Sequence, residues 1–217
     1  MKVGHQTDFT TGNIPKQLIT FSIPMLLGNI LQTLYTTVDS IWVGRFLGPE
    51  ALGAVSVSNP VAFVIIAFVL GLGMAVNIMV AQYLGAKKHL ELKNTIGTSL
   101  TLFTLIGAIL TVIGLIFHQD ILEIIQTPET ILPLASSYLY IYFWGLIFVF
   151  LYNTIGGILR GLGDSKTPLL LLVYSTIINI ILDPFLIIGI PPFPKMGVPG
   201  ASLATILSQA FSGLLVM

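Results

Sequence analysis

The sequence contains no cysteine and carries few charged side chains for its length. Only 8% of its 217 residues are acidic or basic, whereas a soluble domain carries about 25%. The absence of cysteine excludes disulfides, thiolate metal sites and cysteine nucleophiles. With 55% hydrophobic residues and a mean hydropathy of +0.96, the composition indicates a polytopic membrane protein.

Several functional signatures are also absent. The formal net charge is zero and no basic cluster resembles a phosphate-binding stripe, so we expect no nucleic-acid partner. The sequence shows no nucleophile–base arrangement, phosphate-binding loop or dinucleotide fingerprint. The three histidines, His5, His89 and His118, lie in polar breaks and share no ligand spacing. The sequence therefore predicts neither an enzyme, nor a transition-metal site, nor an organic cofactor.

Long apolar runs separated by short polar breaks organise the chain. A membrane-spanning helix needs about 20 mostly apolar residues, and six runs meet that requirement. Gly, Pro and Lys are frequent in the breaks, as expected of loops. After a polar segment, 1–15, the predicted spans are 16–41, 54–82, 95–117, 132–158, 167–190 and 199–217. The sequence thus predicts an all-α membrane protein with six transmembrane helices and no soluble domain.

The basic residues fall unequally on the two sides that these spans define. One side holds Lys2, Lys16, Lys87, Lys88, Lys93, Arg160 and Lys166, and the other holds only Arg45 and Lys195. Because basic loops remain cytoplasmic, we expect both ends of this chain in the cytoplasm and its spans in the cytoplasmic membrane. The last predicted span barely crosses the bilayer and its GLLVM end has no charged flank, so we expect the sequence to be truncated.

Asp39 and Asp183 are the only charged residues that the predicted spans place inside the membrane. A carboxylate there costs about 2.5–3.5 kcal/mol on insertion scales, so the pair implies a function. At 1.5 Å per residue, Asp39 lies ~33 Å along its helix from Gln17. Asp183 lies ~24 Å from Thr167, and Thr205 only ~9 Å from the outer start of its helix. All three therefore fall in the outer half of the bilayer.

Other polar groups share helix faces with these residues, because residues four apart lie on one face of a helix. The pairs are Asn179 with Asp183, Tyr35 with Asp39, and Ala201 with Thr205. Carboxylates, an amide oxygen, a hydroxyl and free carbonyls form a hard-oxygen set that suits Na⁺ or a proton. We therefore predict one pocket that binds the cation driving transport. The alternatives are an interfacial position for Asp39 and a purely structural role for Asp183.

Prolines interrupt two of these spans. Pro184 has no N–H, so it leaves the carbonyl of Ile180 without its helical partner and biases Asp183 away from helical geometry. A broken helix beside an intramembrane acid is how transporters expose backbone oxygens to a coupling ion. Pro24, inside the first span, is a possible hinge. Asn153, in the fourth span, either lines a cavity or bonds a neighbouring helix.

Two other groups of residues indicate structural roles, namely anchoring at the membrane interface and close packing of helices, rather than ligand binding. Aromatic side chains that cluster near one outer interface are expected to anchor the chain there: Tyr138, Tyr140, Tyr142 and Trp144. Glycines inside the second and fourth spans are expected to allow close helix packing: Gly71, Gly73, Gly156 and Gly157.

Four separated segments resemble the multidrug and toxic compound extrusion (MATE) family of the MOP flippase superfamily. They are IPMLLGNILQTLYTTVDSIWVGRFLG, GILRGLGDSKTP, NIILDPFLIIG and GVPGASLATILSQ, and the resemblance covers essentially the whole chain. It implies the amino-terminal lobe of a twelve-helix, two-lobe transporter whose carboxy-terminal lobe is missing here or is a separate chain. It also implies a Na⁺- or H⁺-coupled antiporter that exports drugs or organic, often cationic, compounds.

The resemblance further implies roles for particular residues. Prokaryotic family members bind the coupling cation, Na⁺ included, through residues that match Asp39, Asn179, Asp183 and Thr205 and through a carbonyl that matches Ala201. Tyr35 and Asn153 would be supporting polar residues, and the first helix would bend at Pro24.

Two other functions remain as alternatives. A lipid-linked oligosaccharide flippase of the same superfamily would need a cationic cleft, and apart from Lys16, the first residue of the first span, no Arg or Lys lies within a predicted span. A non-transporting membrane fragment would need a partner lobe. The expected partners are therefore the bilayer, a small-molecule export substrate and a second six-helix lobe.

Overall fold

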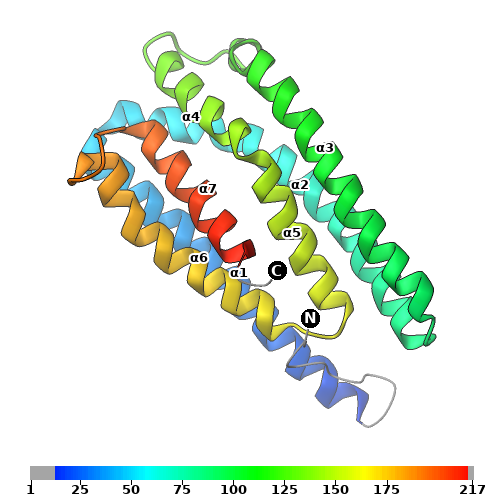
Figure 1. Cartoon of the computed structure of the whole chain (residues 1–217). Coiled ribbons are helices and arrows are strands. Elements are labelled where there is room, and N and C mark those ends of the chain that lie inside the picture. Colours follow the sequence, from blue (N-terminus) through cyan, green and yellow to red (C-terminus); the bar gives the residue numbers. More distant parts are fainter. Residues whose placement is uncertain (1–12, 215–217) are drawn as a thin grey trace.

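The computed structural model describes residues 13–214, and these form helices joined by short connections (Figure 1). In chain order the elements are α1 (Ile14–Leu47), α2 (Pro49–Gly85), α3 (His89–Ile124), α4 (Leu132–Trp144), α5 (Leu146–Gly161), α6 (Lys166–Pro184), the π-helical turn η1 (Phe185–Gly189) and α7 (Val198–Leu214). The predicted all-α class is confirmed. Most of the predicted cytoplasmic segment 1–15 and the last three residues of the predicted sixth span lie outside the described residues.

Four helices are long and apolar enough to cross a membrane. They are α1, α2, α3 and the continuous segment Lys166–Gly189. The bent pair α4 and α5 makes a fifth candidate if the two helices form one span. The sixth predicted span corresponds to α7, whose 17 described residues extend about 26 Å, slightly less than the hydrocarbon thickness of about 30 Å.

The connection between α1 and α2 is one residue, much shorter than the break predicted between 41 and 54. Gly48 alone separates the helices, with φ at 91°. Glycine adopts a positive φ at no steric cost, and Pro49 begins α2 where its missing N–H is not needed. Arg45 in the last turn of α1 and Glu50 in the first turn of α2 each carry the charge that the helix dipole favours. The polar residues that suggested a loop are therefore helix ends.

The predicted fourth span, 132–158, is two helices rather than one. α4 and α5 meet at Gly145 with a bend of 53°. A Cβ atom at Gly145 would overlap the side chain of Ile206 in α7. The bend and the missing side chain together let α7 lie against both α4 and α5, in the middle of the bundle (Figure 1).

The apolar core lies mainly between α2, α3, α4 and α5, and the outer faces are also apolar. Phe103 and Phe150 pack edge to face with ring centroids 6.4 Å apart, and both are buried. Large side chains such as Phe63 and Val64 are more than two-thirds exposed. In water such faces would be costly, whereas lipid chains are as apolar as these side chains. The exposed surface is therefore that of a membrane protein.

Glycines set the closest approach of α2 and α5. A Cβ atom at Gly157 would lie 3.0 Å from the carbonyl oxygen of Gly73, and one at Gly161 would lie 2.7 Å from the carbonyl oxygen of Asn77. Small residues let membrane helices approach in this way. The predicted packing role is confirmed for Gly157, whereas a Cβ atom at Gly73 would meet no atom within 4 Å. A Cβ atom at Gly71 would meet no atom within 4 Å.

We predict that Gly161→Ala destabilises the lobe. The new methyl group would collide with Asn77 and Val80 of α2, and overpacking of this kind costs about 1–3 kcal/mol. The apparent melting temperature of the purified protein, followed by tryptophan fluorescence, should fall. Gly71→Ala is the control, because its methyl group has room and alanine favours a helix. Equal melting temperatures for the two variants would contradict this account of the α2–α5 interface.

Candidate cation site

One stripe of α1 faces the bundle and carries an acid. Tyr35, Asp39 and Val43 are buried and recur every four residues, so they occupy one face of the helix. Asp39 is 8% exposed. Its Oδ1 has no hydrogen-bond partner among residues 13–214. α1 continues past Asp39 to Leu47, and Asp39 faces the inside of the bundle. Its depth in the membrane, on which the interfacial alternative depends, stays a prediction.

The second acid lies on α6 and is completely buried, as is Asn179 one turn before it. The Asn179 Nδ2 donates a hydrogen bond to Asp183 Oδ1 at 3.3 Å. Within the described chain, Asp183 Oδ2 and Asn179 Oδ1 have no hydrogen-bond partner. Buried oxygens almost always have a partner in native proteins, so unpartnered ones call for a ligand, an ion or water.

A hydrogen bond joins α1 to α7 at the same place. The Tyr35 hydroxyl donates to Thr205 Oγ1 at 2.9 Å, and Thr205 Oγ1 in turn donates to the Ala201 carbonyl oxygen at 3.2 Å. The carboxyl groups of Asp39 and Asp183 lie close enough for their charges to interact, and Tyr35 interacts with both. α1, from the start of the chain, and α6 and α7, from its end, therefore bring these polar groups together.

Tyr138 of α4 belongs to this group, although the sequence interpretation treated it as an interfacial anchor. It interacts with both acids and is buried. The anchoring prediction is wrong for Tyr138 and Tyr142, which are 7% and 4% exposed, whereas Tyr140 and Trp144 are exposed. The spacing of the four aromatic residues indicates this difference. Tyr138 and Tyr142 are one turn apart on one face of the helix, and the two exposed rings lie on another face.

The expected break at Pro184 takes a different form. α6 remains helical through Asp183, because Pro184 has φ near −62°, which a helix accepts. The predicted departure of Asp183 from helical geometry is therefore wrong. The disruption appears one residue later, where η1 widens the helix and Ile190 N–H bonds to the Phe185 carbonyl. Such π-helical turns are frequent at functional sites.

The start of α7 packs directly on η1. Met196 N–H donates to the carbonyl of Leu186 at 2.9 Å. A Cβ atom at Gly200 would lie 2.6 Å from the same carbonyl oxygen, so only glycine allows this approach. These contacts fix the height of Ala201 and, one turn later, of Thr205.

The predicted supporting residue Asn153 and the predicted hinge Pro24 have no described bond to this network. Asn153 Nδ2 donates to the Val149 carbonyl of its own helix at 2.8 Å, and no described bond joins it to the acids. Pro24 is buried inside α1, which is helical on both sides of it. The roles proposed for Asn153 and Pro24 stay predictions.

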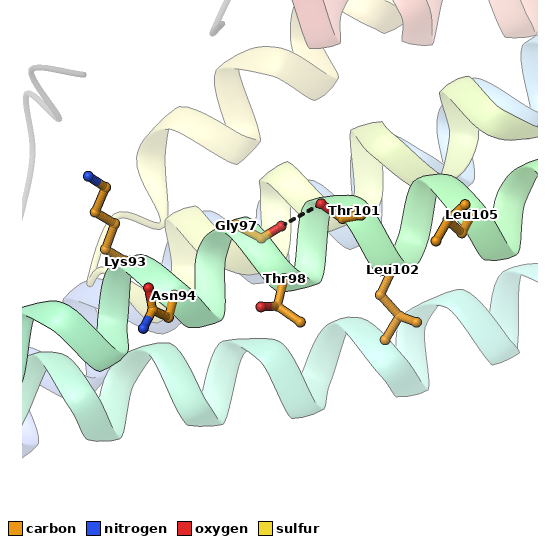
Figure 2. Close-up of a pocket in the computed structure, with 7 residues that line it drawn as sticks. All are labelled: Lys93, Asn94, Gly97, Thr98, Thr101, Leu102 and Leu105. Atoms are coloured by element: carbon orange, nitrogen blue, oxygen red, sulfur yellow. Dashed lines mark hydrogen bonds between the residues drawn. The ribbon is translucent and has the colours of Figure 1, made fainter.

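A groove of about 640 Å³ opens elsewhere, on one face of α3 (Figure 2). It is lined by Lys93, Asn94, Gly97, Thr98, Thr101, Leu102 and Leu105. Because a single helix supplies this lining, the groove is an exposed helix face, and it contains none of the acidic residues.

The oxygen set around Asp39 and Asp183 suits a proton or a hard cation. It combines two carboxylates, an amide oxygen, a hydroxyl and the Ala201 carbonyl, and Na⁺ prefers such ligands. The described residues contain no cluster of three or more His, Cys, Asp or Glu side chains. The unpartnered oxygens of Asp39, Asn179 and Asp183 are where such an ion would fit.

Comparison with known proteins identifies similar chains. The MatE family model matches residues 24–185. The "Probable multidrug resistance protein YoeA" of Bacillus subtilis (strain 168) is 43% identical over 91% of this chain and 42% of its own length. The "FAD transporter" of Shewanella oneidensis is 31% identical over 90% of this chain and 43% of its length.

Among solved structures, a MOP superfamily transporter from Pyrococcus furiosus superposes with a TM-score of 0.86 at 34% identity. The match covers 94% of this chain and 44% of that protein. The chain therefore spans less than half the length of each of these relatives.

We predict that Tyr35 and Thr205 stabilise the fold through their hydrogen bond. Tyr35→Phe and Thr205→Val should each lower the free energy of unfolding, and a double-mutant cycle should give a coupling of about 0.5–1.5 kcal/mol. Unfolding of the protein in mild detergent would be followed by circular dichroism. Tyr174→Phe is the control, because the Tyr174 ring is half exposed. Additive effects at Tyr35 and Thr205 would show that the bond contributes nothing.

Proposed function

Because the chain belongs to the MatE family, we propose that it is the ion-coupling lobe of a Na⁺- or H⁺-driven antiporter. The antiporter would export drugs or other organic, often cationic, compounds across the cytoplasmic membrane. The fold is that of one lobe of a twelve-helix transporter. The relative named as a multidrug resistance protein supports the proposed class of substrate.

The observation that carries the proposal is the pair of buried acids with unpartnered oxygens. Buried charge is costly inside a membrane protein and marks ion pathways and proton relays. Because Asp39 lies on α1 and Asp183 on α6, a bound cation would hold these two helices together. A ligand can shift a conformational equilibrium only if it binds one state more tightly. An ion that bridges α1 and α6 meets that condition if α1 moves, with Pro24 as the proposed hinge.

The lobe needs a partner to enclose a substrate. The relatives are more than twice as long as this chain, so a second six-helix lobe, in the same chain or in another, would complete the cleft. Exposed apolar side chains on α1 and α2 offer the surface for it, among them Ile19, Leu26, Phe68 and Met74. Met and Leu surfaces adapt to many ligands and specify none, which suits a multidrug transporter.

The described helices of this lobe offer no basic side chain in mid-span to a pyrophosphate, although FAD, which one relative is named as transporting, contains one. Arg45 and Arg160 lie in the last turns of their helices. Within the described helices, no Arg or Lys lies near the middle of a span. A flippase for a pyrophosphate-linked oligosaccharide would require such a cation, so it remains the weaker alternative.

We predict that Asp39→Asn and Asp183→Asn each abolish cation-driven export. The amide keeps the size of the side chain but cannot carry the charge that binds Na⁺ or exchanges a proton. The measurement is efflux of ethidium, a probe organic cation, from cells that lack their own multidrug pumps and express the gene at full length. Asp120→Asn is the matched control, because Asp120 is exposed at the end of α3. Wild-type efflux from both acid variants, at equal expression, would refute the proposed coupling site.

A further inference from the structure

A row of polar side chains leaves the cation site along α7. Thr205, Ser208, Gln209 and Ser212 follow at helical spacing, and Ser208 and Ser212 are completely buried. The row extends about 10 Å from Thr205 to Ser212 at 1.5 Å per residue. It runs away from the start of α7, which packs on η1, and towards the end where the chain is expected to reach the cytoplasm.

α6 contributes to the same row. The Ser175 hydroxyl, 2% exposed, donates to Ser208 Oγ at 3.2 Å. Ser208 Oγ donates in turn to the Thr205 carbonyl at 2.8 Å. Ser175 lies one turn before Asn179, on the face that carries Asp183. We call these five residues the α6–α7 seam: Ser175, Thr205, Ser208, Gln209 and Ser212.

The seam contains buried oxygens without a protein partner. Gln209 Oε1 and Ser212 Oγ have none within residues 13–214. Some buried hydroxyls elsewhere bond the carbonyl four residues before them, as Ser58 and Thr154 do at 2.8 and 2.7 Å, and others, such as Thr111 and Thr127, are unpartnered like those of the seam. An unpartnered buried polar group costs about 1–3 kcal/mol. In native proteins this cost is usually removed by water or by an ion.

Near Ser212, apolar side chains border the seam on the side of α5, and there is open space beside Gly213. Ser175 pairs with Ser208 in antiparallel helices, so Leu171 lies at the height of Ser212. Leu171 packs with Ile155 and Leu159 in an apolar cluster that closes the side towards α5. At Gly213, which is buried, an added Cβ atom would meet nothing within 4 Å. The packing beside this turn of α7 therefore leaves space that a water molecule can occupy.

We propose that the α6–α7 seam is a water-filled route inside this lobe, through which the coupling cation exchanges between the Asp39–Asp183 site and the cytoplasmic side. The proposal rests on the proposed cation-coupling function. A cation that leaves a buried site needs oxygen ligands or water at every step, because bare passage through an apolar interior is prohibitively costly. The seam supplies hydroxyl and amide oxygens at successive helical turns, and beside it Ile155, Leu159 and Leu171 form an apolar cluster.

The absence of cysteine in these 217 residues allows a direct test. Single Ser→Cys changes are nearly isosteric, and Ag⁺ is a small cation close to Na⁺ in size that binds thiols. Ag⁺ would be applied in chloride-free buffer to inside-out vesicles carrying the full-length protein, with any cysteine outside these residues replaced. Thiols that remain free would then be alkylated after denaturation and counted by mass spectrometry.

We expect Ser208→Cys and Ser212→Cys to react with cytoplasmic Ag⁺ at least about tenfold faster than Ser58→Cys, because thiol reactivity follows access. Ser58 is the matched control, since it is equally buried but lies on α2. Adding Ser212→Leu should slow the reaction of Ser175→Cys and leave that of Ser58→Cys unchanged. A route through the seam requires this order of reaction rates. A general loosening of the bundle would instead raise the rate at Ser58→Cys as well.

Reaction rates at Ser208 and Ser212 no greater than at Ser58, or reaction only from the outer side, would overturn the route. This outcome is distinct from failure of the coupling site. Access to Ag⁺ is read without any export, whereas the Asp39→Asn and Asp183→Asn variants test coupling alone. An accessible seam combined with wild-type export from the acid variants would overturn the seam's proposed role for the coupling cation, although the water route itself would stand.

Discussion

A polar group inside a bilayer must find its partners within the protein, and this constraint shapes the lobe. Each acid is expensive to place in the membrane, and each is hidden at a junction of helices. α1 supplies Asp39, α6 supplies Asp183 with Asn179, and α7 supplies Thr205. None of these helices could bury its own polar stripe alone. Their mutual packing is therefore also what creates the candidate cation site.

The lobe is divided between two kinds of contact. α2, α3, α4 and α5 share a core of apolar side chains and glycines, where shape alone determines the fit. The contacts of α7 with α1 and with α6 include hydrogen bonds between hydroxyl groups. Apolar packing tolerates little displacement, because interiors are close-packed. Hydrogen-bonded contacts can exchange partners, so conformational change is more readily accommodated on the α1–α6–α7 side.

Much of this arrangement could be predicted from sequence because it depends on composition and local spacing. Apolar runs identified the helices, and spacing of four residues correctly paired Asn179 with Asp183 and Ala201 with Thr205. What failed depends on tertiary contacts. The bend at Gly145 exists because Ile206 of α7 occupies the space of a side chain. The spacing of Tyr138 and Tyr142 indicates a shared helix face, but the packing of α4 on α7 that buries this face is a tertiary contact that the segment alone does not reveal. Pro184 was read as a break, whereas its fixed φ suits the helix and only the next turn widens.

The one-residue link at Gly48 has a mechanical consequence. α1 carries Asp39, and α2 belongs to the apolar block, so the link ties the ion-binding helix to the rigid part of the lobe at one end. With no slack in the chain, α1 cannot slide along its axis or rotate by a whole turn without dragging α2. The motions left to it are pivoting about that tether and bending along its length, both of which move its far end most. Asp39 lies about 14 Å from Gly48 at 1.5 Å per residue. When α1 pivots at Gly48, Asp39 is therefore displaced only slightly, whereas the N-terminal end of α1 is displaced much further.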